Sequence, residues 1–420
     1  MLKHILKLIK NQRKNNGWVF VELLIVFILL WRSVDTFLIQ GIKSFQPEGF
    51  SVENVYKVTL AVRPHTSSAY IPYAEGNNEA TTNLFRIIDR LKEHPDVEAV
   101  SLSSFYSMPF SYTNKTSTYF KDSVGINSLV YEVTPDYFRV FDIRLSDGEL
   151  FSHPAEAFSD GYIISSTLEE ALFKTEAATG KYITETQGDS VRHRVAAVTV
   201  PLKKNGFDSF QNVLFRPLTN GELYKTSEQE LTRIQICFRT RPGVAGSTEY
   251  ANRFKKEMKK SLSSGNFWLA EVQYYADFRT RFLDNSIDMN GRKIDIAINL
   301  FLLANVFLAI IGTFWFRIIR RRGELGLRMA FGSTRSDIQK LVIGEGLLIL
   351  TVAAIPALLV CINIAHMELI STDVLPITVG RFLLVSVLTW VILAAIITLA
   401  VWYPSRKASR LEPVEALHYE

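Results

Sequence analysis

Side chains that could perform catalysis or bind a cofactor are scattered along this sequence rather than grouped. No GxxxxGK[S/T] loop offers a phosphate cradle, because the Gly180-Lys181 pair is followed by tyrosine. No HExxH pair or spaced cysteine pair predicts a metal site, and the seven histidines are dispersed. Asp142, Asp147 and Glu149 are more typical of a solvated turn than of an acid–base pair. The sequence therefore predicts no catalytic residue, no metal and no directly bound cofactor.

The strongest pattern is a basic, glycine-punctuated segment, residues 317–340, between two apolar runs. Its only acidic residues are Glu324 and Asp337. Its basic residues are Arg317, Arg320, Arg321, Arg322, Arg328, Arg335 and Lys340. Short loops this rich in Lys and Arg remain on the cytoplasmic side of a membrane. Thr334, three residues before Asp337, predicts a capping box for the helix that follows.

Four apolar runs are long enough to span a bilayer, which takes about 20 residues per helix. They are predicted at residues 17–39, 294–316, 341–365 and 381–403. The first run is expected to be a retained anchor, because no small-x-small cleavage site follows it. The domain between the first two runs, residues 40–292, is long enough to bury cores of its own.

Charge bias orients these helices. Residues 1–16 and the tail, 404–420, are rich in Lys and Arg, as is the segment 317–340, whereas the connection 366–380 contains neither. The positive-inside rule places both termini and the basic segment in the cytoplasm, and the large domain outside. Residues 1–16 also fit an amphipathic helix lying on the inner leaflet. The net charge of +5 reflects this topology, so nucleic acid is not an expected partner.

Periodicity in the outer domain predicts two strand–helix–strand units. The first comprises strands Val55–Val62 and 97–102 around helix 82–91, and the second comprises strands 234–238 and 267–275 around helix 247–262. Strand patterns at 129–133, 161–165 and 194–200 fill the stretch between them. We therefore expect an α-helical membrane protein with four transmembrane helices and a large α+β extracytoplasmic domain, made of two α/β lobes and a β-rich insertion. Cys237 is predicted to be a buried core residue.

Three segments resemble the permeases of the MacB/FtsX/LolC-LolE group of ABC transporters, also called type VII. RRRGELGLRMAFGSTRSDI is similar to the family pattern R-x-x-E-[IL]-G-[IL]-R-x-A-x-G in the inner loop. The tail PSRKASRLEPVEALHYE resembles the family's closing motif, with His418 where Arg is usual. VTPDYFRVFDIRLSDGELF resembles a motif of the outer domain, with Glu149 replacing the usual Arg. The resemblance covers nearly the whole chain.

The resemblance implies a permease subunit, and the lack of a phosphate-binding loop in the sequence predicts that it contains no ATP site of its own. Its outer domain would have two porter-like lobes, and two protomers, identical or related, would pair. Asn299 and Asn305 are candidate contacts between the two protomers. ATP and Mg²⁺ would bind in a separate ABC ATPase subunit, which would dock on a coupling helix of the inner loop. The coupling residues carried over from the family are Glu324, Leu325, Gly326, Leu327, Arg328, Met329 and Gly332.

Two functions remain open at this point. The first is mechanotransmission for export or release of a peptide, antibiotic or lipoprotein, with a membrane-fusion protein and an outer-membrane channel as further partners. The alternative is an FtsX-like, non-transporting signal transducer that controls an extracytoplasmic protein. In both cases the protein would be a multi-pass subunit of the cytoplasmic (inner) membrane, with its large domain periplasmic or extracellular. A plain membrane-anchored binding module would not explain the inner-loop motif.

Overall fold

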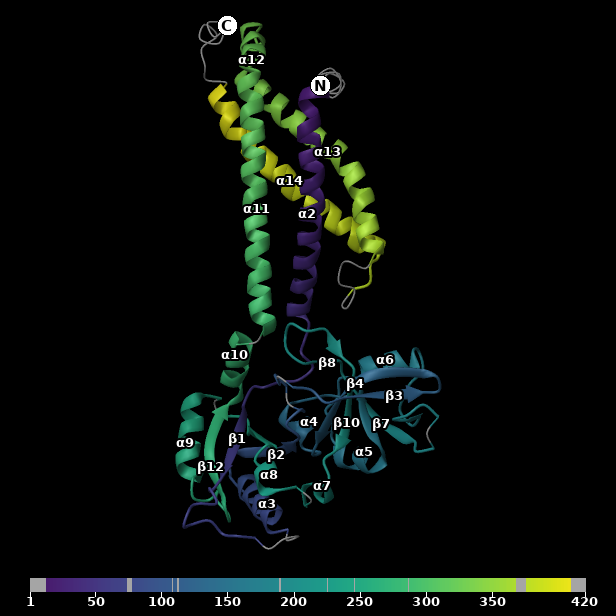
Figure 1. Ribbon diagram of the computed structural model, residues 1–420, viewed down its shortest axis with the longest axis vertical. Coiled ribbons are helices and arrows are strands. Elements are labelled where there is room, and N and C mark those ends of the chain that lie inside the picture. Colours follow the sequence, from purple (N-terminus) through teal and green to yellow (C-terminus); the bar gives the residue numbers. More distant parts are fainter. Residues whose placement is uncertain are drawn as a thin grey trace. The chain divides into compact units, whose positions relative to one another are not determined.

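The computed structural model describes residues 13–73, 78–107, 109–111, 113–188, 190–224, 226–244, 246–285, 287–367 and 375–408. The chain divides into two compact units. The helical unit combines Met1–Ser44 with Gly291–Glu420, and the α/β unit is Phe45–Asn290 (Figure 1). Most of the predicted amphipathic helix 1–16 and most of the predicted tail 404–420 lie outside the described residues.

Among its described residues, the helical unit contains four helices that are long and apolar enough to cross a membrane, as the sequence predicts. They are α2 (Arg13–Phe45), α11 (Ile287–Arg320), α13 (Arg335–His366) and α14 (Val379–Ala408), and a short helix, α12 (Arg322–Ala330), joins α11 to α13. A buried aliphatic and aromatic cluster, which includes Phe27, Trp31, Phe314 and Leu350, holds the four together.

Close approach of three of these helices depends on Gly346 in α13. A Cβ atom placed there would lie 2.8 Å from Cγ2 of Ile397 and 3.0 Å from the Phe314 ring. Small residues allow membrane helices to approach closely and gain van der Waals contact, which drives their association in lipid. Gly346 therefore sets the spacing of α13 against α14 and α11.

The first lobe of the α/β unit joins both predicted strand–helix–strand units in one sheet. Its elements are β1 (Val55–Val62), α3 (Glu79–Lys92), β2 (Val97–Ser103), β11 (Gln235–Thr240), α9 (Thr248–Met258) and β12 (Phe267–Tyr274). The strand order is β12-β1-β11-β2, and each neighbour is antiparallel. This interleaved β-α-β-β-α-β arrangement is ferredoxin-like.

Both helices of the first lobe cover the same face of the sheet. Alternate strand residues such as Tyr56, Val58 and Phe238 share a core with Leu84 of α3 and Phe254 of α9. Because successive strand side chains point to opposite faces, other residues of β1, β2 and β11, such as Val55, Ala99 and Cys237, face a second core. Cys237 belongs to that second core and is buried, as predicted.

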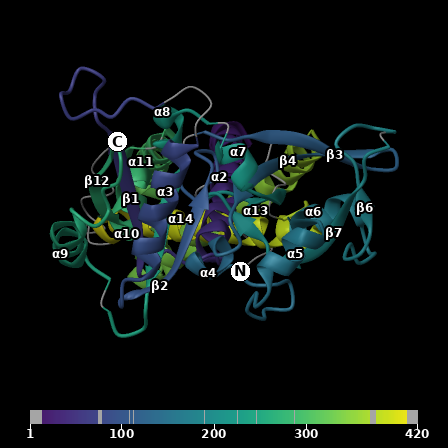
Figure 2. The same cartoon turned by 90° about the horizontal axis from the view of Figure 1, so that it is seen from below.

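The stretch between the two units forms a second lobe on the same sheet. Ser103 of β2 pairs with Val133 of β4, and the sheet continues in the order β4-β10-β5-β7-β6, with β3 paired to β4. The strands are β3 (Thr116–Lys121), β4 (Val124–Val133), β5 (Tyr162–Ser165), β6 (Tyr182–Ile183), β7 (His193–Thr199) and β10 (Val213–Pro217). Figure 2 shows the lobes side by side, with α9 at one margin and β6 at the other.

Short elements complete the unit. The remaining helices are α4 (Tyr137–Val140), α5 (Pro154–Asp160), α6 (Ser166–Phe173), α7 (Asn220–Tyr224), α8 (Glu228–Leu231) and α10 (Tyr275–Asn285), and a small hairpin pairs β8 (Leu202–Lys203) with β9 (Phe210–Gln211). The α/β class of the domain agrees with the prediction. Its internal plan differs, because the two strand–helix–strand units share one lobe and the β-rich stretch builds the other.

Candidate functional site

The basic segment between α11 and α13 forms a helix with a break at each end. Arg321 separates α11 from α12. After α12, Gly332 adopts a φ of +96°, and its N–H donates to the carbonyl of Met329 at 3.0 Å. Glycine suits such a left-handed position because it has no Cβ atom. The predicted capping box is present, with Thr334 and Asp337 bonded reciprocally at the start of α13.

Arg321 joins α12 to the third membrane helix. Its guanidinium binds Glu324 of α12 through two hydrogen bonds of 2.8 and 2.9 Å, and it binds Glu345 of α13 at 2.5 Å. Arg328 adds a 3.1 Å bond to Glu324. The Glu345 side chain is only 2% exposed and that of Arg321 is 12% exposed, so solvent screens this contact little. Bidentate arginine–carboxylate pairs fix orientation as well as adding energy.

Electrostatics favour the charged forms of Arg321 and Glu324. Hydrogen bonds from Arg321 are the main reason that the pKa of the Glu324 carboxyl lies below its ordinary value, although partial burial opposes them. Burial alone would lower the pKa of Arg321, but its bonds to Glu324 and Glu345 outweigh that effect and raise it. The orientation of α12 is therefore fixed by permanent charges.

The coupling residues predicted from the sequence divide between the two sides of α12. Gly326 is buried and Met329 packs on the core of the membrane helices, whereas the Leu327 side chain is 50% exposed. Phe331, four residues after Leu327, is 84% exposed, and the sequence analysis did not select it. The signal that could have found Phe331 is its i+4 spacing from Leu327 on one helical face. The side chain of Leu325 is not among those described.

A second buried ion pair lies between α2 and α14. Arg381 donates to both carboxylate oxygens of Asp35, at 2.9 and 2.7 Å, and also to the carbonyl of Leu375. Both side chains are almost completely buried, with 4% and 3% exposed. The sequence analysis missed this pair, although one acidic residue in the first apolar run and one basic residue at the start of the fourth were a signal. Charged residues within membrane helices usually pair with each other.

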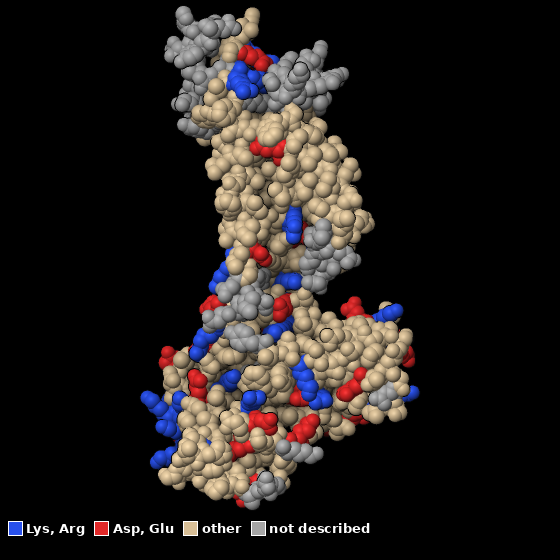
Figure 3. Space-filling model, in the orientation of Figure 1, with Lys and Arg blue, Asp and Glu red and all other residues tan. Residues whose placement is uncertain are grey.

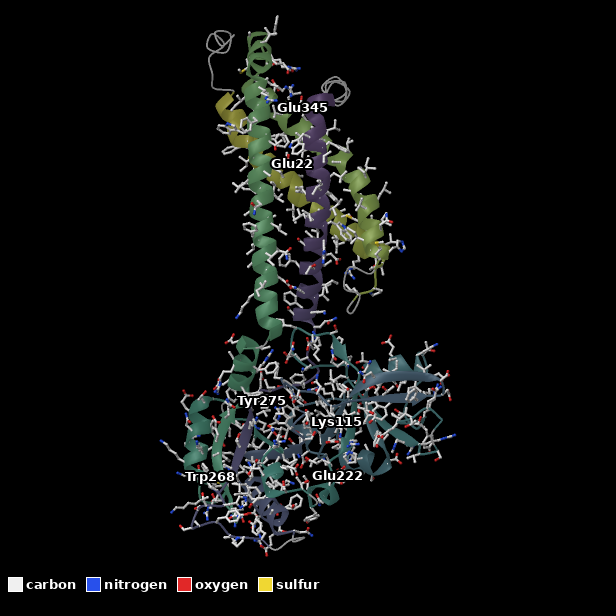
Figure 4. The ribbon with its side chains drawn as sticks, viewed as in Figure 1. Glu22, Lys115, Glu222, Trp268, Tyr275 and Glu345 are labelled. Atoms are coloured by element: carbon white, nitrogen blue, oxygen red, sulfur yellow. The ribbon has the colours of Figure 1, made fainter. Side chains whose placement is uncertain are left out.

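The remaining membrane-facing polar residues make local or interhelical contacts. Glu22 of α2 accepts a 2.9 Å hydrogen bond from Thr313 of α11. Figure 4 shows Glu345 toward the end of the helical unit that carries α12, with Glu22 further along the bundle. The amides of Asn299 and Asn305 donate to carbonyls of their own helix, at 2.8 and 2.7 Å.

Helix α11 is the least covered of the four spanning helices. Only 6% of its most apolar window is buried, against 28–33% for the others. Asn299 and Asn305 both lie on this sparsely covered helix. Each of these amide nitrogens donates one hydrogen bond to a backbone carbonyl of its own helix.

Within the α/β unit, a buried cluster connects the chain after α2 to the chain before α11. Glu48 binds Arg279 of α10 at 2.6 Å, and the buried Lys203 contacts the carbonyl of Gln46 at 3.4 Å. Burial raises the pKa of Glu48, while Arg279 and then Lys203 counteract it. The Arg279 guanidinium also stacks over the ring of Phe110 at 5.4 Å. The two connections to the membrane helices are thus held at one point of the unit.

Comparison with known proteins decides the family. Residues 36–249 match the model for the MacB-like periplasmic core domain, and residues 296–413 match that for the FtsX-like permease C-terminal region. The chain belongs to the MacB/FtsX-type permease family. Each match coincides with one unit, since the first lies mainly in the α/β unit and the second in the helical unit. The protein is therefore a multi-pass membrane protein of the ABC permease class with an extracytoplasmic domain.

Curated relatives are similar at low identity. The macrolide export ATP-binding/permease protein MacB of Bordetella avium is 22% identical over 345 residues, which cover 77% of this chain and 48% of that protein. The protein of the same name from Agrobacterium fabrum is 21% identical over 336 residues, again covering 77% and 48%. The chain thus spans about half the length of the curated relatives it matches.

Solved structures show limited overall similarity. The periplasmic region of MacB from Actinobacillus actinomycetemcomitans aligns with 57% of this chain and 95% of its own, with a TM-score of 0.34 and 14% identity. The extracellular domain of the noncanonic ABC-type transporter YknZ aligns with 51% of this chain and all of its own, with a TM-score of 0.30 and 16% identity.

Proposed function

We propose that this permease transmits ATP-driven motion of an ABC ATPase to its extracytoplasmic domain, and so drives export or release of a client. The observation that supports this proposal is the Arg321 network, which attaches the short helix α12 to the third membrane helix through buried charges. A force applied to α12 would pass to α13 rather than being lost in a flexible loop. Leu327 and Phe331 supply an exposed apolar face for the ATPase.

Transmission to the outer domain would use the two chain segments that connect the units. The Glu48–Arg279 pair joins the segment after α2 to helix α10, which precedes α11. A relative shift of α2 and α11 would therefore act on the Glu48–Arg279 contact, which links the two connecting segments, instead of on each segment independently. Such a device needs two discrete states that both ends can bias.

The expected partners follow from this mechanism. ATP and Mg²⁺ would be bound by the ABC ATPase, which we expect to be a separate subunit docked in the cytoplasm. A second protomer would pack on the sparsely covered helix α11, with Asn299 and Asn305 at the contact. A peptide, antibiotic or lipoprotein is the expected client, handed on through a membrane-fusion protein and an outer-membrane channel. The match to the MacB-like core domain favours export over the alternative, an FtsX-like signal transducer.

Copurification tests the proposal. The full-length protein is purified in mild detergent from its native host, and the copurifying ABC ATPase is identified by mass spectrometry and assayed for ATP hydrolysis. We expect Leu327→Glu/Phe331→Glu to lose the ATPase, because two charges replace the exposed apolar face. Ser336→Glu, which adds a charge at an exposed position of α13, serves as the control and should retain it. Equal recovery with all variants would refute docking on α12, and absence of any ATPase from the wild type would refute the coupling mechanism.

A further inference from the structure

Strand β12 forms one edge of the extracytoplasmic sheet. It pairs with β1 and, in the described part of the chain, with no strand on its other side. Its eight residues, FWLAEVQY, contain neither proline nor lysine, the usual protection of an exposed edge. A bulge between Leu269 and Glu271 leaves a regular stretch on either side. The main-chain N–H and C=O of Phe267 already pair with Ser264, so the strand offers the outward main-chain groups that follow Phe267 to another chain. It lies between the segments 36–249 and 296–413 that match the family models.

The two faces beside this edge differ in chemistry. Leu269 and Val272 point into the core beneath α9 and are buried. Trp268, on the other face, is 40% exposed, and Glu271 on that face is exposed too. Figure 4 shows Trp268 at the margin of the lobe. An added strand would therefore meet an aromatic surface and an acidic group on one face, and the flank of α9 on the other.

Two contacts fix the rotation of α9 about its axis. Glu257 lies 3.4 Å from His94, which follows α3, so this side of α9 faces the interior of the sheet. Thr248 hydrogen-bonds to Asp277 of α10, directly after β12. Buried Phe254 points down onto the sheet. The side of α9 that carries Thr248 therefore faces the open edge.

Lysines line that same side. Lys255 and Lys259 follow Thr248 by seven and eleven residues, which places them within about 20° of it around a helix of 3.6 residues per turn. Lys256 is exposed and is rotated by a further 100°, toward solvent and α3, and the exposed Lys260 follows the C-cap Lys259 in the turn after α9. Figure 3 shows basic side chains at the margin of the lobe where Figure 1 places α9. The flank of the open edge is therefore positively charged.

We propose that β12 accepts an acidic, extended segment of an extracytoplasmic partner protein as an added strand. Main-chain hydrogen bonds would supply affinity, and alternate side chains would supply specificity. Residues of the partner facing α9 would be Asp or Glu, because Lys255 and Lys259 lie there. Residues on the opposite face would be apolar, because they contact Trp268 and because an acidic group there would be repelled by Glu271.

Peptide binding to the full-length protein in neutral-lipid nanodiscs tests this edge. The probe is a fluorescein-labelled octapeptide of alternating Glu and Val, followed by fluorescence anisotropy. We expect saturable binding that is at least tenfold weaker for a Lys–Val octapeptide. Alternate backbone nitrogens of the Glu–Val peptide form two sets, only one of which can point toward β12. N-methylation of that set should also weaken binding at least tenfold, because its N–H donors are lost. Equal binding of the methylated and unmethylated peptides for both sets would refute strand addition.

Matched charge reversals test the flank. Lys255→Glu/Lys259→Glu should weaken binding of the Glu–Val peptide at least tenfold, whereas Lys256→Glu/Lys260→Glu should change it less than twofold. Equal effects of the two pairs would mean nonspecific attraction and would overturn the proposal. Absence of peptide binding, together with self-association that Lys255→Glu/Lys259→Glu abolishes, would assign the edge to a second copy of the chain. These outcomes do not depend on docking of the ATPase.

Discussion

The buried pair between Asp35 and Arg381 gives the sharpest prediction on stability. Substitution Arg381→Leu leaves the Asp35 carboxylate, 3% exposed, without the guanidinium that now binds both of its oxygens. Removing one partner of a buried ion pair typically costs about 3–5 kcal/mol, because the remaining charge is desolvated without compensation. At about 1.4 kcal/mol per tenfold change, the unfolding equilibrium should shift by roughly two to three and a half orders of magnitude.

The control is the double substitution Asp35→Leu/Arg381→Leu, which removes both charges. Replacing a buried ion pair by apolar groups is often close to neutral, so the double variant should recover most of the lost free energy. The contact between α2 and α14 formed by Trp31 and Phe382, whose ring centroids are 5.5 Å apart, is retained in both variants. Reversible unfolding in mixed detergent–SDS micelles, followed by circular dichroism, measures both changes. The reasoning is refuted if Arg381→Leu costs less than about 1 kcal/mol, or if the double variant is no more stable than the single one.

Three further predictions follow from other contacts. Arg321→Gln should leave the ATPase bound but abolish the effect of ATP on the outer domain. This effect is measured as the ATP-dependent change in distance between spin labels on the outer domains of paired protomers. An unchanged response would exclude the contact between Arg321 and Glu345 from transmission. Thr334→Ala should destabilise the start of α13 by about 1 kcal/mol through loss of its cap, measured by hydrogen exchange of that turn against Thr398→Ala. In the α/β unit, burial alone would raise the pKa of Glu132, but hydrogen bonds and charges from Lys115 and Arg216 outweigh it and lower this pKa below 4.5. The stability that these contacts confer should therefore be present above about pH 4.5 and be lost as the pH falls through the pKa of Glu132 in the folded protein. The free energy of unfolding should therefore depend less on pH across that range for Glu132→Gln than for the wild type. Parallel plots of unfolding free energy against pH would contradict the assignment.

The positions of the four spanning helices were the easiest property to predict, because each helix is encoded locally by a long and mainly apolar run. The capping box at Thr334 and the turn at Gly332 were predictable for the same reason, since each depends on residues within one helical turn. The interleaving of the two strand–helix–strand units was not predictable in this way. Periodicity identifies strands and the faces they bury, but it carries no information about which strand pairs with which.

Contacts between distant charges were the hardest to predict. Arg321 lies in a basic loop and Glu345 in an apolar run, and nothing local in the sequence indicates that they meet. The same holds for Asp35 and Arg381, which are separated by the whole outer domain. Phe331 was overlooked because it occupies a variable position of the quoted pattern, between Ala330 and Gly332, and its exposure depends on the turn that ends α12. Tertiary packing, rather than local propensity, decides these positions.

The interleaved first lobe has a consequence for biogenesis. Tyr56 of β1 pairs with Tyr274 of β12, and β11 must enter between β1 and β2, so the sheet closes only after nearly the entire domain has emerged. Such non-local pairing is slow, and it leaves unpaired strand edges exposed while the chain is incomplete. The last strand to arrive, β12, directly precedes α10 and the second membrane helix. Completion of the first lobe is therefore coupled in time to insertion of that helix, and during translocation the nascent domain should depend on extracytoplasmic chaperones.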